Sequence, residues 1–170
     1  QVYFHKTGLV AENMLVNVLK RAEELAEKGV ELYASSSLKY FLYNQINKDN
    51  FTEETLEMFS KLDDYDVFSA IKEWTNHTDK VLSLLSNMIV DRKLLRIVIQ
   101  KDVFEASELE KAKAKFSKKL NLTKEEINYF VFTQKIKNQA YNSNEPIFIL
   151  NKKGKLKDIA KASDQLNIQA

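Results

Sequence analysis

Apolar residues in the first part of the chain recur at a helical period. Between residues 11 and 25 they step by three or four positions, which aligns them on one face of a helix. The members of this stripe are Ala11, Leu15, Val18, Ala22 and Leu25. Gly29, which follows, suits the left-handed conformation that often ends a helix. The pattern predicts one long amphipathic helix that ends near Gly29.

The start of this helix lacks a capping residue. Positions 1–4 already have the character of a helix interior, and none of these four residues is a typical N-cap. We therefore expect the chain to be a domain taken from a longer protein.

Shorter helices are predicted between this first helix and residue 91. A polar break at residues 35–37 precedes one of them, and Thr52, Asp63 with Asp64, and Thr78 are placed to start the others. The last helix carries apolar residues on more than one side between positions 81 and 89, which is typical of a buried helix.

The pattern changes after residue 91. Short β-branched or aromatic runs predict strands at 94–99 and 129–136, and a hairpin at 146–150 and 156–159 around Gly154. Between them, Ser107 with Glu110 and Thr123 with Glu126 match capping boxes that open helices. The predicted fold class is mainly α with an α+β C-terminal part: a helical bundle over residues 1–91, followed by a small mixed helix/strand subdomain over 92–170.

Composition excludes several classes of protein. The 170 residues include no cysteine, three glycines and two histidines, so a disulfide scaffold, a thiolate metal site and glycine-rich phosphate loops are excluded. No apolar run approaches the ~20 residues of a membrane helix, so no membrane partner is expected. The N-terminus lacks the apolar stretch of a signal peptide, which favours a cytoplasmic location.

Charge is distributed unevenly along the chain. Residues 1–91 hold nine basic and fifteen acidic residues, a net charge of −6, whereas residues 92–170 hold seventeen and nine, a net charge of +8. One basic stripe on a predicted helix comprises Lys111, Lys115, Lys118 and Lys119. Such a surface can bind phosphate backbones, but a solvated lysine-rich surface is the interpretation that we favour.

Few side chains carry recognisable chemistry. Tyr3 and Lys6 could contact a phosphate, although an ordinary helix start is the better explanation from spacing alone. Neither His5 nor His77 has the partner four residues away that a helical zinc site needs, and we expect His77 to be structural. The carboxylates of Asp63, Asp64 and Asp66 are better explained by helix capping than by cation binding, so no metal site is predicted in this chain.

Three segments in order resemble a known family. They are Tyr3-Phe4-His5-Lys6-Thr7, Leu62-Asp63-Asp64-Tyr65-Asp66, and Val90-Asp91-Arg92-Lys93-Leu94-Leu95-Arg96, with Trp74 before the last. Over residues 2–99 the chain resembles the part of HD-domain phosphohydrolases that follows their catalytic core, within the branch of deoxynucleoside triphosphate triphosphohydrolases. After residue 100 the resemblance is weaker.

The resemblance implies a catalytic centre outside this chain. The family binds a divalent metal (Mn, Mg, Fe or similar) through a histidine, a His-Asp pair and a further aspartate, and the metal polarises phosphate and activates water. The chain contains no His-Asp dipeptide, so it is expected to hold no catalytic residue and no cofactor of its own. The metal ligands would lie in an N-terminal HD domain.

The resemblance also implies roles for four residues. Tyr3 matches a tyrosine that lines the substrate pocket near the phosphates. Lys6, Arg92 and Arg96 match basic positions that contact an effector nucleotide between subunits. Phe4 departs from a polar residue of the vertebrate member, which leaves no basis here for recognising the sugar.

Two functions therefore compete. The first is an accessory, oligomerisation and nucleotide-effector region of a metal-dependent phosphohydrolase, which would pack against its own HD domain, form a homo-oligomer and be inactive in isolation. The alternative is a non-catalytic interaction module that binds a protein partner or nucleic acid through its basic half.

Overall fold

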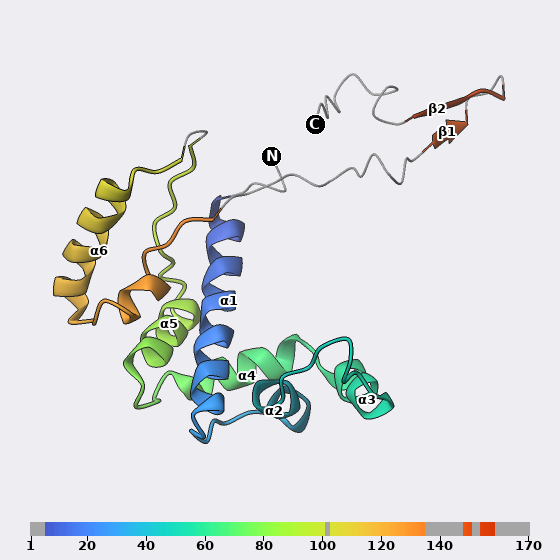
Figure 1. Ribbon diagram of the computed structural model, residues 1–170, viewed down its shortest axis with the longest axis horizontal. Coiled ribbons are helices and arrows are strands. Elements are labelled where there is room, and N and C mark those ends of the chain that lie inside the picture. Colours follow the sequence, from blue (N-terminus) through green and yellow to red (C-terminus); the bar gives the residue numbers. More distant parts are fainter. Residues whose placement is uncertain (1–5, 101–102, 135–147, 151–153, 159–170) are drawn as a thin grey trace. The chain divides into compact units, whose positions relative to one another are not determined.

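The computed structural model describes residues 6–100, 103–134, 148–150 and 154–158 (Figure 1). The chain divides into two compact units, residues 1–132 and residues 133–170. In the first unit, the described elements are α1 (Lys6–Glu27), α2 (Ser36–Tyr43), α3 (Glu53–Lys61), α4 (Asp64–Trp74), α5 (Lys80–Val90), α6 (Ala106–Leu120) and the 3-10 helix η2 (Glu126–Tyr129). The predicted mainly helical fold class is confirmed.

The long first helix forms as predicted. α1 buries one stripe at four-residue steps, and Met14, Val18 and Ala22 in it have no exposed surface. Val10 and Met14 occupy the N-terminal half of this stripe, where Ala11 and Leu15 were expected, so the buried face is rotated by one residue there. Gly29 has a φ of 77°, and the N–H groups of Gly29 and Val30 donate to Ala26 and Leu25, which ends the helix.

Three helix starts are confirmed at the expected residues. The side chains of Ser35, Thr52 and Asp63 accept backbone N–H groups in the first turns of α2, α3 and α4. Asp66 completes the start of α4, because its side chain accepts the N–H of Asp63 at 2.9 Å. Two members of the acidic cluster at 63–66 therefore serve in helix capping.

The core of the first unit lies where α5 packs against α1 and α4. Its largest fully buried side chain is Trp74, whose indole N–H donates to the carbonyl oxygen of Tyr33 at 3.0 Å. Ile71, Leu82 and Leu85 surround the same centre with no exposed surface. α2 packs on α1 and α4, and α3 packs on α2.

Two predicted strands are wrong. Residues 94–99 form no ladder with any described residue, although Leu94, Leu95 and Ile97 pack against the helical core. Residues 126–129 form the 3-10 helix η2, and 130–134 are irregular, whereas 135 and 136 lie outside the described residues. The β-branched pattern correctly indicates apolar positions that need burial. Here they are buried against helices, so no sheet is needed.

Two predicted helix starts also differ. Asp79, not Thr78, caps α5, and its Oδ1 accepts the N–H of Leu82 at 2.9 Å. α6 begins after Glu105 without a side-chain cap, so the box expected at Ser107 and Glu110 is not formed. The box at Thr123 and Glu126 does form, because each side chain accepts the other's N–H, but it opens η2 and not a full helix.

The second unit contains the expected hairpin. β1 (Phe148–Leu150) pairs antiparallel with β2 (Leu156–Asp158), with Ile149 opposite Lys157. Gly154, in the connection, has a φ of 72°. The predicted division after residue 91 differs from the one after residue 132, because Leu122, Ile127 and Phe130 join the same buried core as α1.

Candidate functional site

The three candidate basic residues lie on α1 and on the segment after α5. Lys6 is the first residue of α1 and is exposed. Arg92 and Arg96 are exposed as well, and no side-chain hydrogen bond or ion pair to another described residue involves any of the three. Tyr3, the substrate-pocket candidate, lies outside the described residues.

Arg92 has an unusual backbone conformation. Its φ is 56°, in the left-handed region that costs a non-glycine residue roughly 1 kcal/mol. The conformation ends α5, because the N–H of Arg92 donates to Ile89 at 3.1 Å and the N–H of Lys93 donates to Met88 at 2.8 Å. Glycine is the usual residue at this position of such a helix end, because the left-handed conformation favours a residue without a side chain. The sequence has an arginine there instead.

The segment that follows α5 runs beside α1 (Figure 1). The N–H of Leu95 lies 3.3 Å from the sulfur of Met14, and the adjacent Leu94 and Ile97 pack against the core. Arg96 therefore lies on a segment attached to the N-terminal half of α1, the half that begins with Lys6. The structure brings these two segments together.

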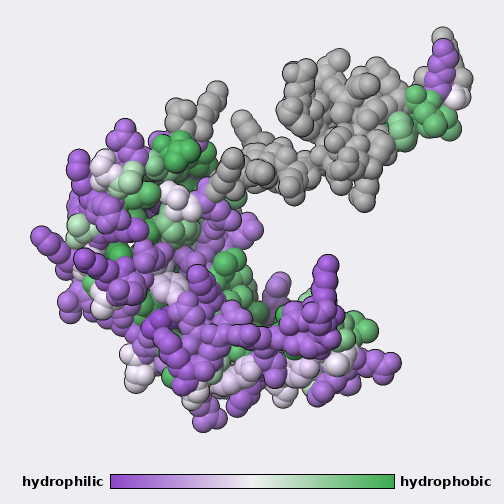
Figure 2. Space-filling model, viewed as in Figure 1, coloured by the Kyte–Doolittle hydropathy of each residue, from purple (hydrophilic) through white to green (hydrophobic). Residues whose placement is uncertain are grey.

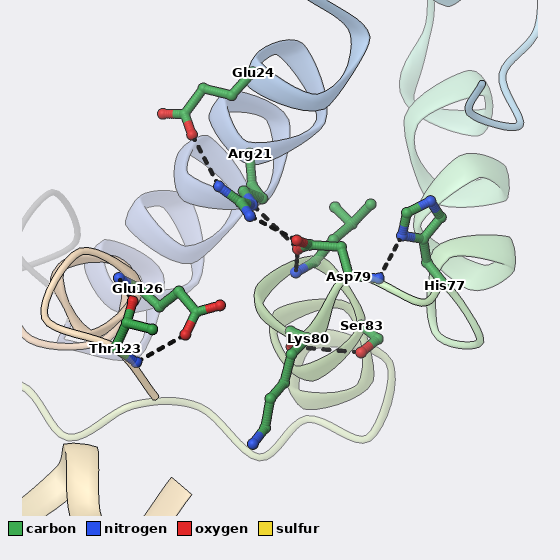
Figure 3. A network of polar contacts seen from close by, with 9 residues as sticks. Arg21, Glu24, His77, Asp79, Lys80, Ser83, Thr123 and Glu126 are labelled. Atoms are coloured by element: carbon green, nitrogen blue, oxygen red, sulfur yellow. Dashed lines mark hydrogen bonds and ion pairs between the residues drawn. The ribbon is translucent and has the colours of Figure 1, made fainter. Parts of the chain in front are cut away.

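A second group of polar side chains forms the most connected part of the first unit (Figure 3). Arg21 on α1 donates Nε to Oδ1 of Asp79 at 3.1 Å and Nη2 to Oδ2 at 2.6 Å. Its Nη1 donates to Glu24 at 3.2 Å. The side chains of Arg21 and Asp79 are each 14% exposed, so this ion pair is largely shielded from water.

The protonation of this pair is strongly biased. The hydrogen bond to Asp79 raises the pKa of Arg21 above its usual range. Burial works to raise the pKa of Asp79, but hydrogen bonds from Arg21 and from the Leu82 N–H, with the charge of Arg21, hold it below its usual value. His77 Nδ1 accepts the N–H of Asp79 at 3.0 Å, which is the structural role expected for this histidine.

Tyr129 of η2 closes the network on its other side. The Arg21 guanidinium lies 5.7 Å from the centre of the Tyr129 ring, and Asn17 Nδ2 donates to the Tyr129 carbonyl at 2.9 Å. Burial, followed by the hydrogen bond and charge of Glu24, raises the pKa of Tyr129 to about 12. These contacts attach η2 to α1.

An open groove of about 380 Å³ lies beside the network. Its lining mixes charges of both signs, with Lys20 of α1, Lys28 of the turn that follows α1, and Glu125 and Glu126 from the η2 region. The network side chains satisfy one another, so the arrangement serves to join α1, α5 and η2. Among the described residues, no group of three or more acidic or histidine side chains is placed to hold a metal ion.

Sequence reasoning missed this network. Neither Arg21 nor Asp79 is singled out by the sequence pattern, which predicts Thr78, the neighbour of Asp79, as the start of the helix. One signal was present: Arg21 directly precedes Ala22 of the buried stripe, so it lies at the edge of that stripe and not on the opposite face.

Comparison with known proteins relates the chain to a phosphohydrolase. No protein-family model matches it. It is similar to a phosphohydrolase of known structure from Bacteroides thetaiotaomicron, with a TM-score of 0.81 and 41% identity, over 97% of this chain and 41% of that one. It is also 30% identical, over 98 residues, to the uncharacterized protein YwfO of Bacillus subtilis (strain 168).

The similarity involves only part of these proteins. The matched region is 58% of this chain and 21% of YwfO, and the chain spans less than half of the Bacteroides phosphohydrolase. Within the part of the chain that the structure describes, no helix is long and apolar enough to cross a membrane.

Proposed function

We propose that this chain is an accessory and oligomerisation region of a metal-dependent, HD-family phosphohydrolase that acts on nucleotides in the cytoplasm. The observation that carries the proposal is the 41% identity to the Bacteroides phosphohydrolase over nearly the whole chain. The segments at residues 3–7, 62–66 and 90–96 support the finer assignment to a branch that resembles deoxynucleoside triphosphate triphosphohydrolases.

In this proposal the catalytic centre belongs to a preceding HD domain. A divalent metal held there would polarise the phosphate and activate water. The chain would contribute Tyr3 to the substrate pocket and pack against that domain. It would have no hydrolase activity by itself.

The same proposal gives Lys6, Arg92 and Arg96 the role of an effector-nucleotide site. The support is geometric: the segment of Arg96 is attached to the half of α1 that begins with Lys6, and all three side chains are exposed. Three cations on adjacent segments suit a polyphosphate, which needs several positive charges to bind. The retention of Arg92 at a left-handed position agrees with a role for its side chain.

The catalytic part of the proposal is tested by nucleotide hydrolysis. Release of phosphate and triphosphate from a panel of nucleotides would be measured with Mn²⁺ or Mg²⁺, for the 170-residue chain and for a protein that joins it to an upstream HD domain. We expect hydrolysis only from the joined protein. Metal-dependent turnover by the chain alone would overturn the accessory role.

The effector part is tested separately by assembly. Lys6→Ala, Arg92→Gly and Arg96→Ala would be introduced into the joined protein, and nucleotide-induced assembly would be followed by sedimentation velocity. Lys48→Ala, which changes an exposed lysine in the loop before α3, is the matched control. Assembly should be lost in the three variants and kept in the control. Unchanged assembly in all of the variants would contradict an effector role for Lys6, Arg92 and Arg96.

A second function is favoured by the surface of α6. This helix has no buried residue, and Lys111, Lys115, Lys118 and Lys119 are all exposed. A non-catalytic module could bind an acidic protein or nucleic acid there. For a generic DNA or RNA duplex, the logarithm of the binding constant should then fall linearly with the logarithm of the salt concentration. An absence of binding at 50 mM salt would contradict a nucleic-acid partner.

A further inference from the structure

Helix α3 exposes an apolar face. Phe51, Leu56 and Phe59 are 51%, 56% and 61% exposed, and the only buried residue of the helix is Thr55. Figure 2 shows apolar surface at the end of the molecule where α3 lies. We call these three residues the α3 apolar face. A face of this kind on a short surface helix marks a place where something binds.

The three side chains form one continuous surface. Thr52 caps the helix, so Phe51 and Leu56 occupy the two positions that pack together in a hydrophobic staple. Leu56 and Phe59 are three residues apart and lie on one side of the helix. Tyr40 and Phe41 of α2 hold α3 in place, through a 3.0 Å hydrogen bond between the Tyr40 and Thr55 hydroxyls and an edge contact of 6.2 Å between Phe41 and Phe59.

The surroundings of the α3 apolar face are acidic. Glu53 and Glu54 in the first turn of α3, and Asp64 at the start of α4, are exposed and have no side-chain partner among the described residues. Glu57 is different, because it pairs with Lys61 at 2.6 Å. The face therefore suits an apolar partner flanked by positive charge.

Helix α6 presents a surface of that kind. Its four exposed lysines, Lys111, Lys115, Lys118 and Lys119, fall within about 100° of the helix circumference at about 100° per residue. Phe116 lies beside this arc and is 39% exposed. We call these five residues the α6 basic face. Within the described residues, Lys113 is the α6 lysine with an ion-pair partner, Glu110, and it lies outside the arc.

The two faces cannot meet within one copy of the chain. α3 and α6 lie at opposite ends of the first unit, with α1, α4 and α5 between them (Figure 1). Among the described residues, both faces are exposed.

We propose that the α3 apolar face of one copy binds the α6 basic face of a second copy. The contact would place Phe116 against Phe51, Leu56 and Phe59, and the lysines of α6 against Glu53, Glu54 and Asp64. The two surfaces differ, so the contact is head-to-tail and each copy can bind two others, in a ring or a chain. The inference rests on surface chemistry alone and does not depend on the proposed hydrolase role.

Charge reversal tests this pairing. Lys111→Glu with Lys115→Glu removes the net positive charge of the α6 basic face, because Lys118 and Lys119 then only balance the two new glutamates. Glu53→Lys with Glu54→Lys makes the surroundings of the α3 apolar face basic. Self-association of the 170-residue chain would be measured by sedimentation velocity at 50 and 500 mM salt. The unaltered chain should associate at low salt and at least tenfold more weakly at high salt. Each double variant alone should associate at least tenfold more weakly at low salt.

The decisive sample is an equimolar mixture of the two double variants. The α3 face of the first variant and the α6 face of the second are both unaltered, so these two faces should bind and association should return. Lys48→Glu with Asp49→Lys, a charge exchange in the exposed loop before α3, is the control and should leave association unchanged. Circular dichroism establishes that each variant keeps its helices, and Leu56→Ser tests the apolar contact without a change of charge.

Three results would overturn the proposal. The unaltered chain could be monomeric at low salt and at several hundred micromolar. Both double variants could associate as it does, which would place self-association on other surfaces. The mixture could fail to regain association although both variants are folded, which would mean that the two faces do not bind one another.

Discussion

Arg21 holds both carboxylate oxygens of Asp79 across 58 positions of sequence, and one of those oxygens also caps helix α5. Nη2 lies 2.6 Å from Oδ2, Nε lies 3.1 Å from Oδ1, and Oδ1 accepts the N–H of Leu82 at 2.9 Å. The side chain of Asp79 thus caps the start of α5 and attaches that helix to α1. Asp79 therefore contributes to stability in two separable ways.

Replacing Asp79 by asparagine should remove the ion pair and keep the cap. Asparagine caps helices as well as aspartate, whereas alanine does not. We expect Asp79→Asn to lower the free energy of unfolding by about 1–2 kcal/mol, because the shielded Arg21 loses its bidentate counter-charge and keeps only Glu24. Asp79→Ala should cost about 1 kcal/mol more. Urea unfolding followed by circular dichroism measures both.

Asp64→Asn is the control for this pair of variants, since Asp64 is exposed and its side chain has no partner among the described residues. Arg21→Met should make the Asp79→Asn change nearly neutral. Equal losses for the asparagine and alanine variants would mean that the cap adds nothing beyond the ion pair. The pKa of Asp79 is lowered in the fold, so its contribution is present at neutral pH and is lost as pH falls through the pKa of the folded state.

Tyr129 should make the protein sensitive to alkali. Its pKa is raised to about 12 in the fold, against about 10 for a free tyrosine. Between these two values the unfolded chain loses the proton and the folded chain keeps it, so stability falls as pH rises from about 10 to 12. Tyr129→Phe should flatten this part of the stability profile relative to the unaltered protein.

The matched control is Tyr33→Phe, because Tyr33 is 57% exposed. The control should keep the full alkaline loss of stability. If Tyr129→Phe and Tyr33→Phe gave the same profile from pH 9 to 12, the environment of Tyr129 would not be the cause.

Local features of this fold were predictable, and those that depend on distant residues were not. Thr52 and Asp63 cap the helices that directly follow them, so a few neighbouring residues suffice to identify them. Thr78 and Asp79 are both good caps in sequence, and the choice between them involves Arg21, which the chain brings from far away. The pairing of Arg21 with Asp79 therefore left no local signal beyond the position of Arg21 beside the buried stripe.

The wrong strands have a similar cause. Leu94, Leu95 and Ile97 were correctly identified as apolar positions that need burial, but a strand also needs a partner ladder. In the described residues the helices provide the burial, and the Leu95 N–H meets the Met14 sulfur at 3.3 Å. The roles of Lys6, Arg92 and Arg96 stay predictions, because they concern a ligand and not the fold.

Ser86 should be better replaced by alanine. Its hydroxyl is fully buried on α5 and has no hydrogen-bond partner among the described residues. Burying an unpaired hydroxyl costs about 1–3 kcal/mol, so we expect Ser86→Ala to raise the free energy of unfolding by about 1 kcal/mol or more. Thermal or urea unfolding would measure the gain.

Part of any such gain would come from the higher helix propensity of alanine. Ser69→Ala, at an exposed position of α4, measures that part alone. The gain at Ser86 should exceed the gain at Ser69. A loss of stability at Ser86 would mean that the hydroxyl has a partner in solution, such as a buried water.

Substitutions at Arg92 can distinguish the contribution of its backbone conformation from that of its side chain. Its φ of 56° is favourable for glycine and unfavourable for arginine or alanine. We expect Arg92→Gly to keep or raise the free energy of unfolding, by up to about 1 kcal/mol, and Arg92→Ala to change it little. Urea unfolding of the two variants measures this difference.

A marked destabilisation by glycine would show that the guanidinium has contacts which hold the end of α5, and would argue against a free effector cation. A stable Arg92→Gly protein that no longer assembles with nucleotide would instead assign the side chain to the ligand, because the variant loses a charge without losing the fold.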